Sequence, residues 1–167
     1  LRFRQGENTK AIEHAAAALA VADEDDIGAG LTKAKAHLAQ GEAGAATELF
    51  SRYWEDSPDL VSREDAAAYV EALTAGERRK EALTVLRVWP ERYGYERGLG
   101  LRESVLWEQM GRIPEAILAA AKELEYARSH GLVKSDDILR RIDELQGRLA
   151  GTDGVATLQG VRAYFSE

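Results

Sequence analysis

The sequence predicts an all-α protein built from repeated helical hairpins, and three observations lead to this prediction. Four glycines, Gly6, Gly41, Gly76 and Gly111, stand 35 residues apart, which is a period typical of helical repeats. A small residue follows each glycine at a nearly constant distance. The composition agrees, because apolar residues make up 45% of the chain and aromatic residues only 7%, with alanine supplying much of the apolar share.

The small residue is alanine in every copy. It stands five residues after the glycine at Ala11, Ala46 and Ala116, and one position late at Ala82 in the third copy. A glycine ends a helix well because it adopts the left-handed conformation without a Cβ clash. The alanine then lets the second helix of the hairpin cross the first closely. Each hairpin has an apolar face that it cannot bury alone, so we expect it to stack on its neighbour.

The same pattern gives approximate helix positions. Pro90 is expected to end one helix early and to leave a longer connection through Gly94. The predicted helices lie near residues 8–22, 27–40, 43–57, 62–75, 78–89, 97–110, 113–130, 135–149 and 153–165.

The C-terminal part differs from the repeats before it. Ser135 is a candidate N-cap, and the helix that follows has one apolar stripe with charged residues on its other faces. The stripe consists of Ile138, Ile142, Leu145 and Leu149. An internal repeat helix needs two buried faces, whereas a single stripe suits an end. We therefore assign residues 1–130 to repeats, the first truncated, and residues 131–167 to a degenerate fifth repeat or to capping helices.

The second copy resembles the tetratricopeptide repeat over its whole length, and residues 5–19 and 111–117 resemble the turn and second helix of that family. The positions that match its small, aromatic, glycine and proline places are Ala34, His37, Gly41, Ala46, Phe50, Tyr53 and Pro58. The spacing of 35 departs from the usual 34, and the third copy carries an extra residue. The resemblance implies a right-handed superhelical solenoid of about four repeats plus a capping helix pair.

The family places residues two, five, nine and twelve of each first helix on the concave surface of the superhelix. The resemblance therefore implies a partner-binding groove suited to an amphipathic helix or a hydrophobic peptide. Carried onto this chain, the groove residues are Phe3, Leu31, Lys35, Leu38, Leu101, Val105 and Glu108. The competing interpretation is that neighbouring repeats, or flanking segments of a longer chain, cover these side chains.

Composition excludes several function classes. The net charge is −7, with Lys and Arg scattered among Asp and Glu, so the chain has no basic stripe for nucleic acid. No apolar run approaches the ~20 residues of a membrane span. Without cysteine there are no disulfides or thiolate metal sites. Cysteine usage therefore does not distinguish the cytoplasm from the periplasm as the compartment of a soluble protein. Homo-oligomerisation also stays open.

The polar motifs favour structural roles. His14, His37 and His130 lack the spacing of a metal or catalytic site. The acidic run 23–26 fails the calcium-loop pattern, because Ala34 stands where the twelfth-position glutamate is needed. We predict no catalytic, cofactor-binding or metal-binding residue.

Two further motifs have a structural explanation. Gly94, Gly98 and Gly100 lack the preceding strand and the spacing of a phosphate-binding loop, so they are interpreted as an ordinary connection. Aromatic residues could form a base-stacking platform, but these fall at repeat core or junction positions, which favours packing. They are Tyr53, Trp54, Trp89 and Trp107.

The leading functional hypothesis is a protein- or peptide-binding scaffold, and we expect no enzyme because no nucleophile–base set or carboxylate pair stands out. One alternative is a sensory or regulatory repeat domain of a larger bacterial regulator. Another is the scaffold of an envelope secretion or polysaccharide-export system. The chain begins at Leu1 without an initiator Met or a signal-peptide pattern, so we expect it to be a piece of a larger protein.

Overall fold

The computed structural model describes residues 26–131 and 135–150. These residues form seven α-helices and one short 3-10 helix, and none of them lies in a strand, which confirms the all-α prediction for the described part of the chain. The predicted helices at 8–22 and 153–165 lie outside the described residues. The chain divides into two compact units, Leu1–Val85 and Leu86–Glu167.

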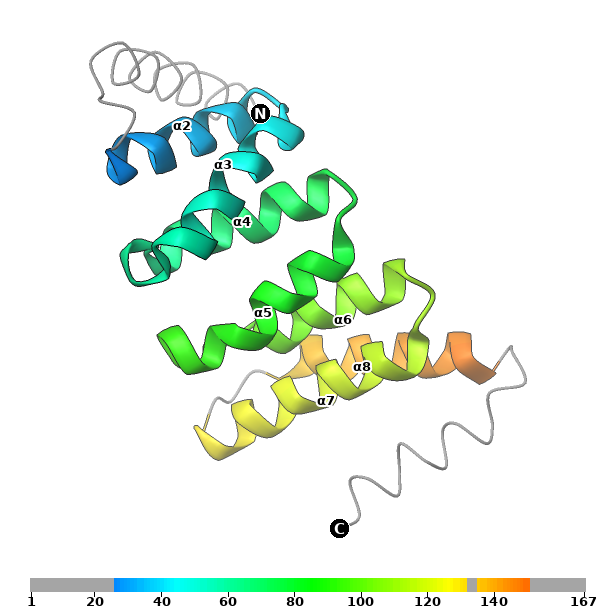
Figure 1. Cartoon of the computed structure of the whole chain (residues 1–167). Helices are drawn as coiled ribbons and strands as arrows, with labels where there is room; N and C mark the ends of the chain where they lie inside the picture. Colours follow the sequence, from blue (N-terminus) through cyan, green and yellow to red (C-terminus); the bar gives the residue numbers. More distant parts are fainter. Residues whose placement is uncertain (1–25, 132–134, 151–167) are drawn as a thin grey trace, which may run out of the picture. The chain divides into compact units, whose positions relative to one another are not determined.

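The first unit contains α2 (Ile27–Ala39), α3 (Ala43–Asp56), the 3-10 helix η1 (Pro58–Leu60), α4 (Arg63–Ala75) and the first half of α5 (Arg79–Tyr93). Helix α3 packs against both α2 and α4 (Figure 1). The ends of α2, α3 and α4 agree with the predicted ends within one residue. The core of this unit consists of side chains from the buried faces of these helices and of Val61, which lies just before α4. Its larger members include Leu31, Phe50, Tyr53, Val61, Tyr69, Val70 and Leu73.

Polar residues fix where these helices begin. The Asp26 side chain accepts hydrogen bonds from the amides of Gly28 (2.9 Å) and Ala29 (3.3 Å), and so caps α2. Ser62 and Asp65 form a capping box at the start of α4, in which each side chain bonds to the backbone amide of the other. Pro58 begins η1 directly after α3, in agreement with the predicted stop.

Three turns between paired helices share one geometry. Gly41, Glu77 and Gly111 have φ angles of 81°, 60° and 72°, respectively. Each donates its amide to the carbonyl three residues earlier, at 3.0, 3.1 and 2.8 Å, and the next amide reaches back five residues. This is the hydrogen-bonding pattern that closes a helix end at a left-handed residue.

The third turn corrects the register of the third copy. Gly76 has a φ of −81°, so the residue in the left-handed conformation is Glu77 rather than the glycine. Counted from Glu77, Ala82 stands five residues downstream, as Ala46 does from Gly41 and Ala116 from Gly111. The late alanine is therefore in register, and the glycine is the residue out of place.

This turn gives a prediction. A residue with a Cβ is strained in the left-handed conformation, whereas glycine is not. We expect Glu77→Gly to raise the free energy of unfolding by about 0.5–1 kcal/mol, after allowing for the greater freedom of glycine in the unfolded chain. Urea denaturation measures this change. The matched control is Gly41→Ala, which should lower stability by about 1 kcal/mol. A loss of stability in Glu77→Gly would contradict the assigned turn.

The predicted stop at Pro90 is wrong. Helix α5 continues to Tyr93 with Pro90 inside it. Proline has no amide to donate to the carbonyl four residues earlier, but here it sits in the last turn of the helix, and its own carbonyl accepts a bond from Gly94 at 3.0 Å. The helix ends instead at Gly94, whose φ of 79° is a conformation that favours glycine.

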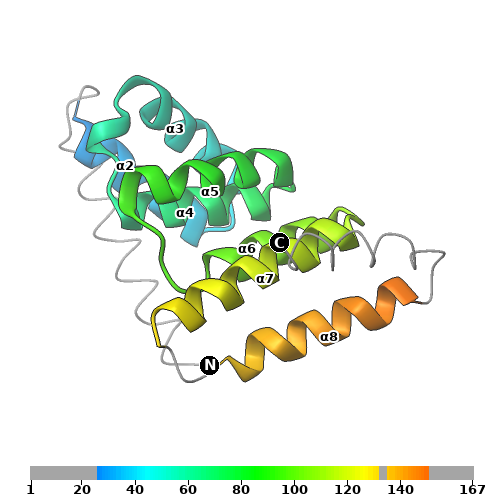
Figure 2. The same cartoon turned by 90° about the horizontal axis from the view of Figure 1, so that it is seen from below.

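The second unit contains the rest of α5, then α6 (Leu99–Gln109), α7 (Ile113–Ser129) and α8 (Asp136–Ala150). Helices α6 and α7 form a hairpin, and α8 runs alongside α7 in both views (Figures 1 and 2). The apolar stripe of α8 faces this hairpin, as the sequence predicted. Leu145 and Leu149 are buried with Ala116 and Ile117, while Ile138 is buried with Leu124 and Ala127.

Ala46 and Ala116 are fully buried, which confirms the close helix crossing predicted for them, and Ala82 is fully buried as well. Because the core has no room for more atoms, Ala46→Leu and Ala116→Leu should each lower the free energy of unfolding by about 1–3 kcal/mol. Thermal melting checks this. Ala45 is exposed, so Ala45→Leu serves as the control and should change little. Unchanged melting of both buried variants would contradict the repeat register.

Candidate functional site

The predicted groove residues of α2 lie in three different environments. Leu31 is buried at 5% exposure and belongs to the core. Leu38 is half-buried. The Lys35 ammonium lies 2.7 Å from the Asp65 carboxylate and 3.9 Å from that of Glu64, both on α4. The sequence analysis did not anticipate that Lys35 binds the neighbouring repeat.

Asp65 holds this contact at the start of α4. It is buried at 7% exposure, and its Oδ2 accepts hydrogen bonds from the amide (3.2 Å) and hydroxyl (2.5 Å) of Ser62. Burial by itself would raise the pKa of Asp65. The hydrogen bonds from Lys35 and Ser62, together with the charge of Lys35, outweigh burial and lower the pKa below 3.8.

The lowered pKa predicts how this contact depends on pH. A carboxyl whose pKa is lower in the folded state stabilises the protein above its unfolded pKa, and that stability is lost as the pH falls through the folded value. Lys35→Met should therefore lower the free energy of unfolding by about 1–2 kcal/mol at pH 7. The difference from the unmodified protein should shrink below about pH 4.

Urea denaturation between pH 7 and pH 3 measures both effects. Lys33→Met is the control, because Lys33 lies on the same helix and is exposed. A Lys35→Met deficit that stays constant down to pH 3 would contradict the assigned ion pair.

Two of the three predicted groove residues of α6 contact neighbouring helices, and the third is largely exposed. Leu101 packs against the cluster of Leu124, Ala127 and Ile138. Glu108 accepts hydrogen bonds from the guanidinium groups of Arg141 and Arg148 on α8. Val105 remains 42% exposed. Phe3, the predicted groove residue of the first copy, lies outside the described residues.

The connection between α5 and α6 is organised by a buried glutamate that the sequence analysis did not identify. Glu123 on α7 is fully buried. Its carboxylate accepts hydrogen bonds from the amides of Gly98 (2.5 Å) and Gly100 (3.0 Å) and from the Tyr95 hydroxyl (3.0 Å). Burial, followed by the nearby Glu123 charge, raises the pKa of Tyr95 above its usual value.

This arrangement explains the three glycines singled out in the sequence. Gly98 is the N-cap residue of α6, with a φ of 92°. The exposed amides of a helix N-terminus attract an anion. Here the anion is the carboxylate of Glu123, which supports the interpretation of this segment as a structural connection. The sequence carries a signal for this contact, which is a repeated spacing. Gly30 and Tyr53 stand 23 residues apart, as Gly100 and Glu123 do. In each pair the glycine lies close to the side chain of the later residue.

An open hollow of about 440 Å³ lies on the α2–α3 hairpin. Lys33 and His37 line it from α2, and Glu48, Leu49 and Arg52 line it from α3. The His37 Nδ1 lies 2.6 Å from a carboxylate oxygen of Glu42. The lining of the hollow thus carries two cations, Lys33 and Arg52, and one carboxylate, Glu48.

Two further searches of the described residues gave negative findings. No group of three or more His, Asp or Glu side chains in this part of the chain is arranged to hold a metal ion. No described helix combines the length and the apolar character needed to cross a membrane.

Comparison with known proteins defines the class of fold. No protein-family model matches the chain, and no curated protein matches it. Solved structures do match over nearly the whole chain, and they are all-helical and tetratricopeptide-like. The described hairpins therefore belong to a tetratricopeptide-like fold, as the sequence predicted.

The matching structures are of the protein MamA. MamA MSR-1 is 21% identical with a TM-score of 0.64, covering 96% of this chain and 95% of that one. MamA AMB-1 is 21% identical with a TM-score of 0.64, and the match covers 98% of this chain and 92% of that one. A mutant form of MamA is 22% identical with a TM-score of 0.62, covering 97% and 98%. At these identities the likeness concerns the fold alone.

Proposed function

We propose that this chain is a protein-interaction scaffold that binds a segment of a partner protein and has no catalytic role of its own. The observation that carries the proposal is the repeated hairpin, with the same turn at Gly41, Glu77 and Gly111. Stacked repeats of this kind offer extended helix faces, and such faces are binding surfaces in many repeat proteins. The tetratricopeptide-like fold is consistent with this use.

The proposed contact residues are those groove members that keep accessible surface. On α2 this is Leu38, which is half-buried, and on α6 it is Val105, which is 42% exposed. Phe3 belongs to the same proposed set by its place in the first copy. The other groove residues already form contacts within the chain, so we assign them to holding the helices rather than to the partner; they are Leu31, Lys35, Leu101 and Glu108.

We extend the proposed surface to the hollow on the α2–α3 hairpin, which the groove residues do not line, and its side chains indicate the chemistry of the partner segment. Lys33 and Arg52 are exposed cations that line it, Glu48 adds one carboxylate, and Leu49 offers half-buried apolar surface in the same hollow. A segment with one apolar anchor flanked by acidic residues would match this surface in both shape and charge. We therefore propose an acidic peptide segment as the preferred partner.

Site-specific photo-crosslinking tests the proposal in two stages. A benzophenone amino acid is placed at Leu38 or Val105, with Leu60 as the control because it is 62% exposed and lies in η1. We expect Leu38 and Val105, but not Leu60, to capture a protein partner that mass spectrometry identifies. Equal capture from all three positions would indicate non-specific contact.

The purified partner then allows affinities to be measured. Arg52→Glu and Val105→Asp should each weaken binding at least tenfold, while Leu60→Asp should leave binding unchanged. Far-UV circular dichroism confirms that each variant is folded. Binding that is insensitive to both test variants would contradict the proposed surface.

A further inference from the structure

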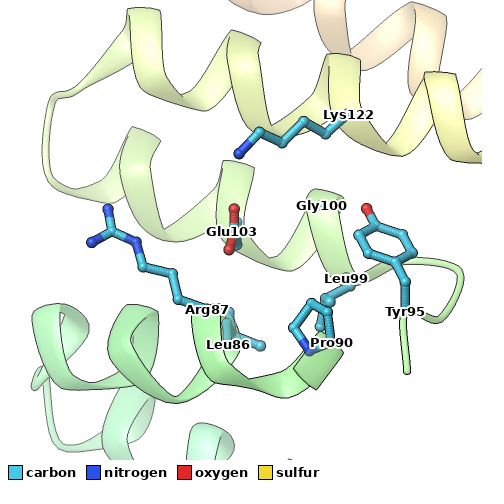
Figure 3. A pocket seen from close by; sticks show the side chains of 8 residues that line it. All are labelled: Leu86, Arg87, Pro90, Tyr95, Leu99, Gly100, Glu103 and Lys122. Carbon is cyan, nitrogen blue, oxygen red and sulfur yellow. The ribbon is translucent and has the colours of Figure 1, made fainter. Parts of the chain in front are cut away.

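A second, smaller cavity is lined only by residues of the second unit, among them Gly100 and Tyr95. Its volume is about 150 Å³ (Figure 3). Leu86 and Pro90 of α5 and Leu99 of α6 form an apolar part of its wall. A cavity of this volume can hold a benzene-sized molecule.

Charged side chains of both signs line the rest of the cavity. Glu103 comes from α6, Lys122 from α7 and Arg87 from α5. In Figure 3 the Lys122 amino group is directed toward Glu103, and the Arg87 guanidinium is seen on the side of Glu103 that is away from Tyr95. The Arg87 guanidinium is held 5.5 Å from the centre of the Trp107 ring, which fixes its position.

These charges are near one another but unbonded. Within the described residues, neither the Glu103 carboxylate nor the Lys122 ammonium forms a hydrogen bond or an ion pair. Burial raises the pKa of Glu103, and Lys122 and Arg87 only partly offset this effect. The Glu103 carboxylate thus lacks a cation at bonding distance, and the two cations lack an anion there.

We propose that this cavity binds a small aliphatic α-amino acid in its zwitterionic form. The ammonium group would bond to Glu103, and the carboxylate would lie between Lys122 and Arg87. The aliphatic side chain would pack on Leu86, Pro90 and Leu99. This site is separate from the surface proposed for the protein partner, and neither proposal depends on the other.

The signs of the charges favour a zwitterion over simpler ligands. A plain cation would bond to Glu103 but would be repelled by Lys122 and Arg87. A plain aliphatic anion would bond to the two cations but would be repelled by Glu103. A zwitterion matches both signs at once, because its ammonium can pair with the half-buried Glu103 while its carboxylate pairs with the exposed Lys122 and Arg87 side chains.

Titration of the ¹⁵N-labelled chain with L-valine, followed by NMR, tests the proposal. We expect saturable shifts of the Leu99 and Gly100 amides, which lie in the cavity wall. Isovalerate lacks the ammonium group and valinamide lacks the carboxylate, so each should bind at least tenfold more weakly. Equal binding of either analogue, or no saturable shift with valine, would overturn the proposal. Tighter binding of N-acetylvaline would also overturn it, in favour of a peptide C-terminus.

Variants provide the second arm of the test. Lys122→Met removes one cation from an exposed position and should weaken valine binding at least tenfold. Lys80→Met is the matched control, because Lys80 is also exposed and does not line the cavity. Melting temperatures confirm that both variants fold. Unchanged valine binding in Lys122→Met would overturn the assigned ligand contacts.

Discussion

Glu123→Ala is expected to lower the free energy of unfolding by roughly 3–5 kcal/mol, which is the largest effect we predict for a single substitution. The buried carboxylate accepts bonds from the Gly98 and Gly100 amides and the Tyr95 hydroxyl. Removing it leaves three donors without their acceptor at and just before the start of α6, and the Gly100 amide among them is buried. Urea denaturation monitored by circular dichroism measures the loss.

Two companion variants sharpen this test. Glu125→Ala on the same helix is exposed and should change stability by less than ~0.5 kcal/mol. Tyr95→Phe removes only one of the three donors and should cost about 1 kcal/mol. If Glu123→Ala were as stable as Glu125→Ala, the carboxylate could not be the group that fixes the beginning of α6.

Gly100→Ala is expected to lower the free energy of unfolding by about 1–3 kcal/mol, although alanine favours helices more than glycine does. A Cβ at this position would lie 2.5 Å from the Ala119 carbonyl oxygen and 2.9 Å from the Cβ of Glu123. The first of these atoms belongs to the backbone of α7 and cannot rotate away. The α6–α7 hairpin would therefore have to open.

Gly44→Ala is the matched control for this substitution. Gly44 lies inside α3, and a Cβ there would meet no atom within 4 Å. Here the helix preference acts alone, so Gly44→Ala should raise the free energy of unfolding by about 0.5–1 kcal/mol. Opposite signs for the same change at two helical glycines are the expected result. A stabilising Gly100→Ala would show that α6 and α7 are not in close contact.

The repeat could be predicted from the sequence because its signal is local. The repeat unit consists of a glycine, a short polar turn and an alanine five residues later. The glycine suits a left-handed φ angle and the alanine suits a close helix crossing, so both requirements can be recognised from the residue types. The stripe of α8 could be predicted for the same reason, since four apolar residues at helical spacing mark the buried face. These parts of the fold are confirmed by the described residues.

The remaining features depend on side chains brought together from distant parts of the chain. Glu123 is one of many glutamates in the sequence, and only the fold places it at the N-terminus of α6. Lys35 was assigned to a groove because α4 could not be positioned against it. Pro90 was assigned to a helix end because the sequence does not show that the last turn of α5 tolerates it.

NMR backbone chemical shifts over residues 26–150 test the central claim, a series of helical hairpins closed by one repeated turn, most directly. We predict helical shifts interrupted after α2, α4 and α6, with left-handed backbone angles at Gly41, Glu77 and Gly111. At the third turn, Gly76 should give the right-handed angles that its φ of −81° implies. A left-handed Gly76 beside a right-handed Glu77, or extended shifts within any of the helices, would contradict the account.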